Sequence, residues 1–142
     1  HKNDDIRARV PTGTVDFAAR LTIPAAISEH RSLGQARKLK ILAAKREHWT
    51  SGVRSLPGVE LAHSEEPDLC AVIGAFRLPG QTSWDQARGA QQRFLEKHQV
   101  LVVAKQGLAS GPVLRVTPAL FNTSDELDRL VDAIRTERAM FT

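Results

Sequence analysis

The chain has 142 residues, 42% of them hydrophobic, and a formal net charge of +4. This length and composition predict one compact, soluble globular domain with a single modest core. No apolar stretch approaches the ~20 residues that a membrane helix needs, and the charged start lacks the apolar segment of a signal peptide. We therefore expect a cytoplasmic protein with no membrane partner.

The basic excess is small, with 20 Lys and Arg against 16 Asp and Glu and a pI of about 9.7. Such an excess of positive charge allows the protein to attract polyanions but does not require that it bind them. The densest basic stretch, residues 35–49, intersperses its charges with Leu39, Leu42 and Trp49, which is typical of the solvated side of an amphipathic helix. Aromatic residues make up 5% of the chain and tyrosine is absent, so few rings are available to stack on bases. A nucleic-acid partner is therefore not expected.

The first half of the chain follows a helical pattern. Residues 1–13 are polar and end in a Pro-Thr-Gly cluster, which predicts a loop. A helix is predicted over 14–32, with a kink or a break and restart at Pro24. A second helix is predicted over 33–55, ended by the LPG at 56–58.

The period then changes to that of strands. Residues 59–63 alternate, and residues 69–78 form a nearly continuous apolar run, which predicts a strand buried on both faces. Helical spacing returns over 82–99, where Thr82 or Ser83 is the expected N-cap.

Two more strands and a helix complete the chain. The strands are predicted over 100–104 and 112–118, separated by a loop with a glycine near each end. Thr123 and Glu126 have the spacing of a capping box at the start of the last helix. The order predicts an α+β (α/β two-layer) fold, with one sheet of about four strands, mostly antiparallel or mixed, backed by helices.

Arg115 interrupts the apolar pattern of the 112–118 strand. Alternation places it on the face opposite Leu114 and Val116, where its charge must reach water, a carboxylate or a ligand. A guanidinium is well matched to a carboxylate held by two hydrogen bonds. The strand pattern alone favours a solvent-exposed or salt-bridged arginine over a ligand-binding one.

Gly13 and Thr14 form a second candidate position. Gly13 allows close backbone approach, Thr14 offers a hydroxyl, and the start of a helix favours a phosphate. The alternative, favoured when the pair is taken alone, is that Thr14 caps its own helix. Elsewhere, Cys70 is expected to be a buried structural thiol, and the five histidines lack the spacing of a metal site. His63 has no nucleophile placed beside it.

The segments TGTVDFAARLTIPAAI and PVLRVTPALFNTSDELDRLVDAI together resemble the C-terminal portion of class V aminotransferase-like enzymes. These are pyridoxal-phosphate enzymes of fold type I, among them cysteine desulfurases, kynureninases and isopenicillin N epimerase-like proteins. The resemblance runs from about Pro11 to Arg135, and its most specific part is RVTPALFNTSDELDRL, which begins at Arg115. It implies a small C-terminal domain over 14–142, a linker over 1–13 from a missing N-terminal large domain, and a homodimer.

The resemblance also implies roles for single residues. A Gly-Thr pair in these enzymes reaches the cofactor phosphate of the partner subunit, which implies that role for Gly13 and Thr14. The arginine of the late strand binds the substrate α-carboxylate, which implies substrate binding by Arg115. Asn122 and Thr123 match the family's Asn-Thr pair and are implied to turn the chain and cap the last helix.

The chain departs from the family in two respects. Val15 stands where many epimerase-like members have an arginine, so a phosphate or substrate contact is expected to be missing. The cofactor's Schiff-base lysine and ring-binding residues belong to the family's large domain. Only eleven residues separate Lys2 from Thr14, too few for Lys2 to be that lysine. We therefore expect no catalytic residue here, no pyridoxal phosphate bound to this segment alone, and no activity of the segment by itself.

Three hypotheses follow. The first is a C-terminal domain of a pyridoxal-phosphate enzyme acting on an amino acid by epimerisation, desulfuration, lysis or transamination. The second is an autonomous basic α+β module that binds an acidic partner or nucleic acid, with an affinity that falls as salt rises. The third is a degenerate family member retained for dimerisation.

Overall fold

The computed structural model describes residues 16–64, residue 66 and residues 69–140. The chain divides into two compact units, His1–Gln35 and Ala36–Thr142. The second unit holds the sheet and the hydrophobic core. The boundary predicted between residues 13 and 14 lies outside the described residues.

Two helices form the described part of the first unit. Helix α2 (Phe17–Leu21) ends at Thr22, and helix α3 (Ile23–Leu33) begins directly after it. The predicted interruption is therefore present, but it lies at Thr22 because Pro24 occupies the first turn of the new helix, where a missing N–H has no hydrogen bond to lose. Neither helix contains a buried residue.

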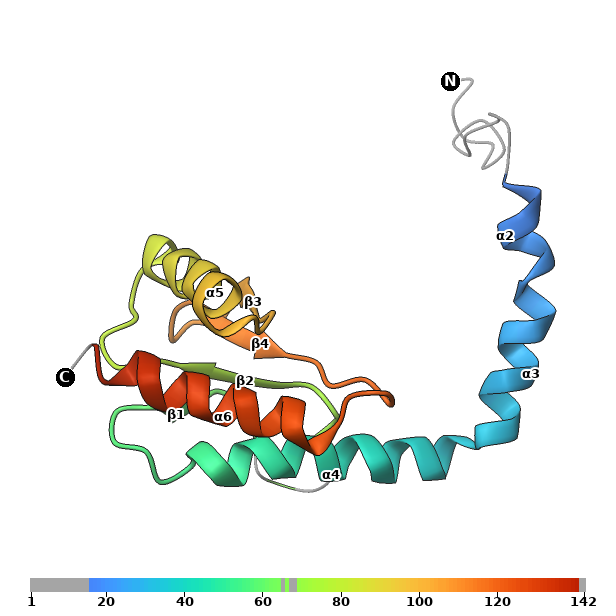
Figure 1. Cartoon of the computed structure of the whole chain (residues 1–142), viewed down its shortest axis with the longest axis horizontal. Helices are drawn as coiled ribbons and strands as arrows, with labels where there is room; N and C mark the ends of the chain where they lie inside the picture. Colours follow the sequence, from blue (N-terminus) through green and yellow to red (C-terminus); the bar gives the residue numbers. More distant parts are fainter. Residues whose placement is uncertain (1–15, 65, 67–68, 141–142) are drawn as a thin grey trace. The chain divides into compact units, whose positions relative to one another are not determined.

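The second unit combines helices with one antiparallel sheet (Figure 1). Its elements are α4 (Gln35–Val53), β1 (Glu60–Leu61), β2 (Gly74–Arg77), α5 (Trp84–His98), β3 (Val103–Lys105), β4 (Val113–Val116) and α6 (Ser124–Arg138). The first residue of α4, Gln35, is counted with the first unit. The strand order is β1-β2-β4-β3, and each described pair of neighbours is antiparallel. The predicted α+β fold with a four-stranded sheet backed by helices is confirmed.

Helices α4, α5 and α6 bury their apolar sides against one face of the sheet. Trp49 of α4, Phe94 of α5 and Ile134 of α6 meet Phe76 of β2 and Leu114 of β4 in a single cluster, and all five are fully buried. The rings of Trp49, Phe76 and Phe94 meet edge to face, with centroids 6.1 and 5.8 Å apart. Removal of this apolar surface from water is the main force that holds the layers together.

The strand predicted over 69–78 is shorter than expected. Only Gly74–Arg77 forms β2, while Leu69 and Ile73 are exposed, so burial on both faces is wrong for the first half of this run. The physical reason is the end of β4, since Gly74 pairs with Val116, the last residue of that strand, and the residues before Gly74 have no strand partner among the described residues.

The segment before β2 holds Cys70 in a half-buried position. Its thiol Sγ donates a hydrogen bond to the Ser64 carbonyl oxygen at 2.8 Å. The expectation of a fully buried thiol is therefore wrong. The contact links the two ends of the connection between β1 and β2, so the thiol has a structural partner.

The two capped helices agree with the sequence. Ser83 accepts a hydrogen bond from the Gln86 N–H at 3.2 Å at the start of α5, and Thr123 accepts one from the Glu126 N–H at 3.3 Å at the start of α6. Both glutamine and glutamate side chains reach back to the N-cap backbone, which completes two capping boxes. Of the two N-caps considered for α5, Ser83 is the one used.

Candidate functional site

Arg115 lies on β4, in the middle of the sheet. It faces Ala75 of β2 on one side and Val103 of β3 on the other. Its sequence neighbours Leu114 and Val116 are part of the core, so Arg115 projects from the face that the helices leave uncovered. Alternation along the strand had predicted this face. The side chain is half-buried, and its Nε has no hydrogen-bond partner among the described residues.

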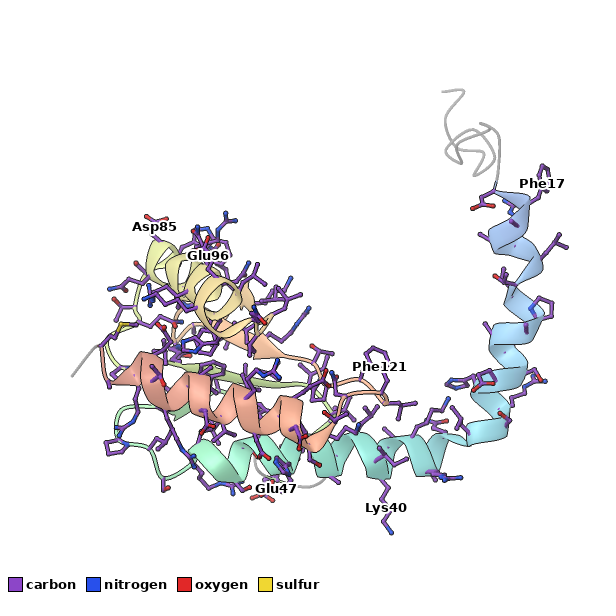
Figure 2. All side chains as sticks on the ribbon, viewed as in Figure 1. Phe17, Lys40, Glu47, Asp85, Glu96 and Phe121 are labelled. Atoms are coloured by element: carbon purple, nitrogen blue, oxygen red, sulfur yellow. The ribbon has the colours of Figure 1, made fainter. Side chains whose placement is uncertain are left out.

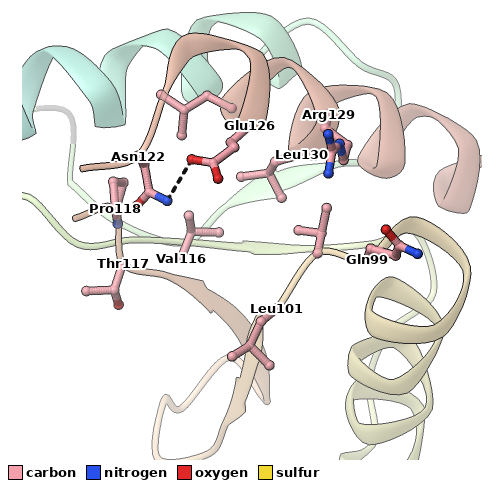
Figure 3. Close-up of a pocket in the computed structure, with 11 residues that line it drawn as sticks. Gln99, Leu101, Val116, Thr117, Pro118, Asn122, Glu126, Arg129 and Leu130 are labelled. Carbon is pink, nitrogen blue, oxygen red and sulfur yellow. Dashed lines mark hydrogen bonds between the residues drawn. The ribbon is translucent and has the colours of Figure 1, made fainter. Parts of the chain in front are cut away.

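Six residues surround and include this position, and we call them the open patch. Ala75, Val103 and Arg115 share one face of the sheet, since the strand residues that alternate with them, such as Gly74 and Ala104, are buried; the other three lie just beyond the strand ends. The open patch consists of Ile73, Ala75, Leu101, Val103, Arg115 and Thr117. Figure 3 shows Leu101 and Thr117 projecting away from α6.

Arg77 fixes the start of β4. It lies on the same face as Arg115 but is only 5% exposed. Its Nη1 is 2.7 Å from the Glu60 carboxylate, its Nε donates to the Pro112 carbonyl at 3.1 Å, and its Nη2 donates to the Ser110 hydroxyl at 2.5 Å. The guanidinium thus joins the edge strand β1 to the loop that enters β4. Arg77 was not predicted from the sequence as a residue of interest, although a charge at the end of an apolar run was a signal.

Lys45 of α4 fixes the other end of β4. Its Nζ donates to the carbonyl oxygens of Leu120 and Asn122, 2.8 Å from the first. The Asn122 side chain accepts from the Ala119 N–H at 2.7 Å and donates to Glu126 at 3.1 Å. Asn122 therefore turns the chain and Thr123 caps α6, as the resemblance implies.

The basic stretch of α4 is only partly a solvated face. Lys40 projects into solvent (Figure 2). Lys45 and Arg46 are half-buried instead and donate to backbone carbonyls, Arg46 to that of Ala71. Two charges of the predicted basic face are thus used to hold loops.

A hollow of about 250 Å³ lies between the end of β4 and the start of α6 (Figure 3). Its floor includes Val116 and Leu130, and its rim includes Glu126 and Arg129. The hydrogen bond from the Thr123 backbone N–H, followed by that from Asn122, lowers the pKa of the Glu126 carboxyl. The Glu126 carboxylate is thus held at the start of α6 by the hydrogen bonds that cap this helix. Arg115 does not line this hollow, whereas Asn122 and two residues of the open patch, Leu101 and Thr117, do.

Gly13 and Thr14 lie outside the described residues, as does Val15. The helix that follows them has another cap, because the Asp16 carboxylate accepts a hydrogen bond from the Ala19 N–H at 3.0 Å. The alternative in which Thr14 caps this helix therefore loses its support. The phosphate role of Gly13 and Thr14 stays a prediction.

The described part of the chain offers no site for a metal ion. Within it, no three His, Cys, Asp or Glu side chains are close enough to hold one. The His63 ring lies 3.3 Å from the backbone nitrogen and oxygen of Ala75 and packs against Trp49, which is a structural position. Of the described helices, none is long and apolar enough to cross a membrane.

The described lysines differ in their surroundings. Lys40, Lys97 and Lys105 are exposed, Lys38 is half-buried and has an interaction partner, and Lys45 is bound to carbonyl oxygens. A Schiff-base lysine instead needs an amine that is sheltered and available for reaction. Arg115 is the residue predicted from the sequence that lies among the described residues and has a buried N–H, at Nε, without a partner there.

Comparison with curated proteins identifies two similar enzymes. The chain is 35% identical over 136 residues to isopenicillin N epimerase of Amycolatopsis lactamdurans, covering 93% of this chain and 32% of the relative. It is 33% identical over 127 residues to isopenicillin N epimerase of Streptomyces clavuligerus, covering 86% and 30%. The chain thus spans about a third of the length of these relatives. No family model matches it.

Solved structures share the fold at low sequence identity. The complex of the cystine C-S lyase C-DES with its reaction product cysteine persulfide gives a TM-score of 0.58 at 18% identity, covering 78% of this chain and 27% of that one. Oryza sativa TDC with PLP and tryptamine gives a TM-score of 0.61 at 14% identity, covering 79% and 25%. These similarities support a class V aminotransferase-like, fold type I C-terminal domain for this chain.

Proposed function

We propose that this chain supplies the substrate-carboxylate site of a pyridoxal-phosphate enzyme that acts on an amino acid, with Arg115 as the binding residue. The observation that carries the proposal is the half-buried guanidinium on the central strand β4, whose Nε has no partner among the described residues. A buried N–H that lacks an acceptor is costly to keep. A substrate carboxylate would satisfy it through charge-assisted hydrogen bonds.

The surroundings of Arg115 favour a well-positioned ion pair. Arg77 holds the start of β4 and Lys45 holds the loop after it, so the strand that carries the guanidinium is fixed at both ends. Ala75 and Val103 flank Arg115 without competing for its hydrogen bonds. Apolar neighbours reduce screening by water and strengthen the attraction to a carboxylate.

The cofactor contributes the electron sink, and the protein contributes binding and orientation. In the intact enzyme the Gly13 N–H and the Thr14 hydroxyl would hold the cofactor phosphate in the partner subunit of a homodimer. The Schiff-base lysine would come from polypeptide outside these 142 residues. Arg115 would fix the substrate α-carboxylate and so orient the bonds at the α-carbon. Since both curated relatives are named isopenicillin N epimerase, epimerisation is the first reaction to assay.

The test is steady-state kinetics of the intact polypeptide with Arg115→Ala and Arg115→Lys. We expect kcat/KM to fall about a hundredfold in Arg115→Ala, because the charge-assisted contacts to the carboxylate are lost. Arg115→Lys should recover part of this loss, since it keeps the charge but loses the planar fork. The matched control is Arg88→Ala, which removes an exposed arginine from α5 and should leave kcat/KM unchanged.

Two results would contradict the proposal. Unchanged kcat/KM in Arg115→Ala would remove the substrate role of this residue. An intact polypeptide without the visible absorbance of a bound pyridoxal phosphate, even after the cofactor is added, would remove the enzyme class. The binding-module hypothesis has less support, because Lys45 and Arg46 of the basic stretch are engaged by backbone carbonyls.

A further inference from the structure

Strand β3 is an edge of the sheet, and its sequence is typical of strands that pair with other chains. The strand order β1-β2-β4-β3 gives β1 and β3 one neighbour each among the described strands. Residues 100–104, which lead into and include most of β3, read VLVVA, without a charge, a proline or a glycine. An edge of this composition offers backbone N–H and C=O groups to a strand of another molecule. The other edge, β1, has two residues and carries the exposed Glu60 carboxylate, which discourages such pairing.

Ala104 carries the backbone groups of β3 that point away from the sheet. In an antiparallel pair, residues whose N–H and C=O groups point at the partner strand alternate with residues whose groups point away from it. Ala104 lies opposite Leu114 of β4, yet its N–H donates to Oε1 of Gln91 at 2.7 Å. The N–H and C=O groups of Ala104 therefore face outward, while those of Val103 and Lys105 face β4. A strand added at this edge would have to bond to Ala104.

Gln91 reaches the Ala104 N–H from helix α5, which lies alongside β3 (Figure 1). Ala87, Ala90 and Phe94 hold α5 against the core, and all three are fully buried. Gln91 follows Ala90 directly and is half-buried, so its side-chain oxygen is held at the edge of the sheet by a packed helix. This amide oxygen occupies the place that a carbonyl oxygen of an added strand would take.

We propose that Gln91 closes the β3 edge and prevents a second copy of the chain from pairing with it. A second copy is the expected occupant because residues 100–104 can pair with themselves. In a two-fold antiparallel contact centred on Ala104, the N–H and C=O groups of this residue would bond to the C=O and N–H groups of Ala104 in the other copy. The Gln91 side chain of each copy blocks this contact. The inference does not depend on the proposed function, because no substrate or cofactor contact enters it.

The experiment compares variants of Gln91 in the intact polypeptide. Gln91→Met keeps the length and helix propensity of the side chain but removes the acceptor, and Gln91→Ala removes the acceptor without adding bulk. Gln91→Glu keeps an oxygen that can accept, and Gln92→Met is the matched control, because Gln92 is exposed and bonds to Glu96 of the same helix.

Two quantities are measured for each variant. Hydrogen exchange at residue resolution, in dilute protein, reports on the Ala104 amide, and sedimentation velocity over a range of concentrations reports on association. We expect the Ala104 amide to exchange at least about tenfold faster in Gln91→Met and Gln91→Ala than in the unsubstituted protein. Both variants should also form larger species as the concentration rises, whereas Gln91→Glu and Gln92→Met should behave like the unsubstituted protein.

Three results would overturn the proposal. Slow exchange of the Ala104 amide in dilute Gln91→Met and Gln91→Ala would mean that another group covers this edge. Faster exchange without larger species at any concentration would mean that Gln91 binds the Ala104 N–H but does not prevent pairing. Larger species formed equally by Gln92→Met would mean that association arises elsewhere than at β3. None of these results bears on the kinetics of Arg115→Ala, so this proposal and the proposed function can fail separately.

Discussion

Two arginines on one face of the sheet have opposite surroundings. Arg77 is saturated by the Glu60 carboxylate and by acceptors of the loop before β4, while the Nε of Arg115 has no partner among the described residues. A saturated, buried guanidinium holds chain segments together. An unsaturated one on a partly exposed strand is available to bind a ligand.

Gly74 is a position where any side chain would overlap a core residue. A Cβ built on Gly74 falls on Cζ2 of Trp49 and 3.4 Å from Cε1 of His63, and Trp49 is fully buried. We predict that Gly74→Ala lowers the free energy of unfolding by about 1–3 kcal/mol, because the tightly packed indole must move. Urea unfolding followed by tryptophan fluorescence measures the change.

The control for Gly74→Ala is Gly89→Ala. Gly89 lies on α5, and the nearest atom to its added Cβ is the flexible Nη1 of Arg93 at 3.5 Å. Since alanine is a better helix former than glycine by about 1 kcal/mol, this variant should be neutral or stabilising. Equal effects of the two substitutions would contradict the packing argument at Gly74.

For single residues, properties that depend on one strand could be predicted from the sequence. Contacts between residues far apart in the chain could not. The face of Arg115 followed from alternation with Leu114 and Val116. The role of Arg77 did not, since its acceptors Ser110 and Pro112 lie more than thirty residues along the chain. No local pattern identifies such partners.

At the scale of elements, a buried carboxylate joins α5 to α6. Glu137 of α6 is fully buried, with one oxygen 2.7 Å from Nε of Arg93 and the other 3.1 Å from Nε2 of His98. Burial alone would raise the pKa of the Glu137 carboxyl, but the hydrogen bonds with Arg93 and His98 outweigh it, so the pKa lies below its ordinary value of 4.5. The ionised form is thus favoured in the folded protein.

This arrangement predicts a loss of stability in acid. Because the pKa of Glu137 is lower in the folded than in the unfolded chain, its contribution is present above about pH 4.5 and is lost as the pH falls through the folded value. We predict that Glu137→Gln lowers the free energy of unfolding at pH 7 by about 3 kcal/mol and flattens its decline toward acid pH. Denaturant unfolding measured at several pH values between 7 and 3 checks both effects.

The control for Glu137→Gln is Glu47→Gln on α4. Glu47 pairs with Arg54 at 3.1 Å, but both side chains are about half exposed. The exposed pair should contribute less than about 1 kcal/mol. If Glu137→Gln lowered the free energy of unfolding no more than Glu47→Gln does, the contacts of Glu137 with Arg93 and His98 would not be a source of stability.

Elements with local signals were predicted more accurately than elements that need distant partners. Helices α5 and α6 begin at capped residues, Ser83 and Thr123, because a capping box is contained within four residues. The strand predicted over 69–78 begins five residues late, since its first residue, Gly74, pairs with Val116, where β4 ends. Strand length thus depended on a partner that the apolar run does not describe.

At the scale of the whole molecule, the two units differ in what stabilises them. The unit Ala36–Thr142 contains the buried core, whereas α2 and α3 contain no buried residue. Helices shorter than about 12–15 residues are marginal in water unless they pack against something. The five residues of Phe17–Leu21 and the eleven of Ile23–Leu33 fall below that length. The free energy of unfolding should therefore reside in the second unit.

Hydrogen exchange and truncation of the 142-residue chain test this division. We predict that amides of Ile23–Leu33 exchange nearly as fast as in an unfolded peptide, while those of Val113–Val116, in the middle of the sheet, exchange only through larger openings. Deletion of residues 1–34 should change the free energy of unfolding by less than about 0.5 kcal/mol, because no core residue is removed. Slow exchange in Ile23–Leu33, or a clear loss of stability on deletion, would mean that the first unit contributes to the folded core of the second.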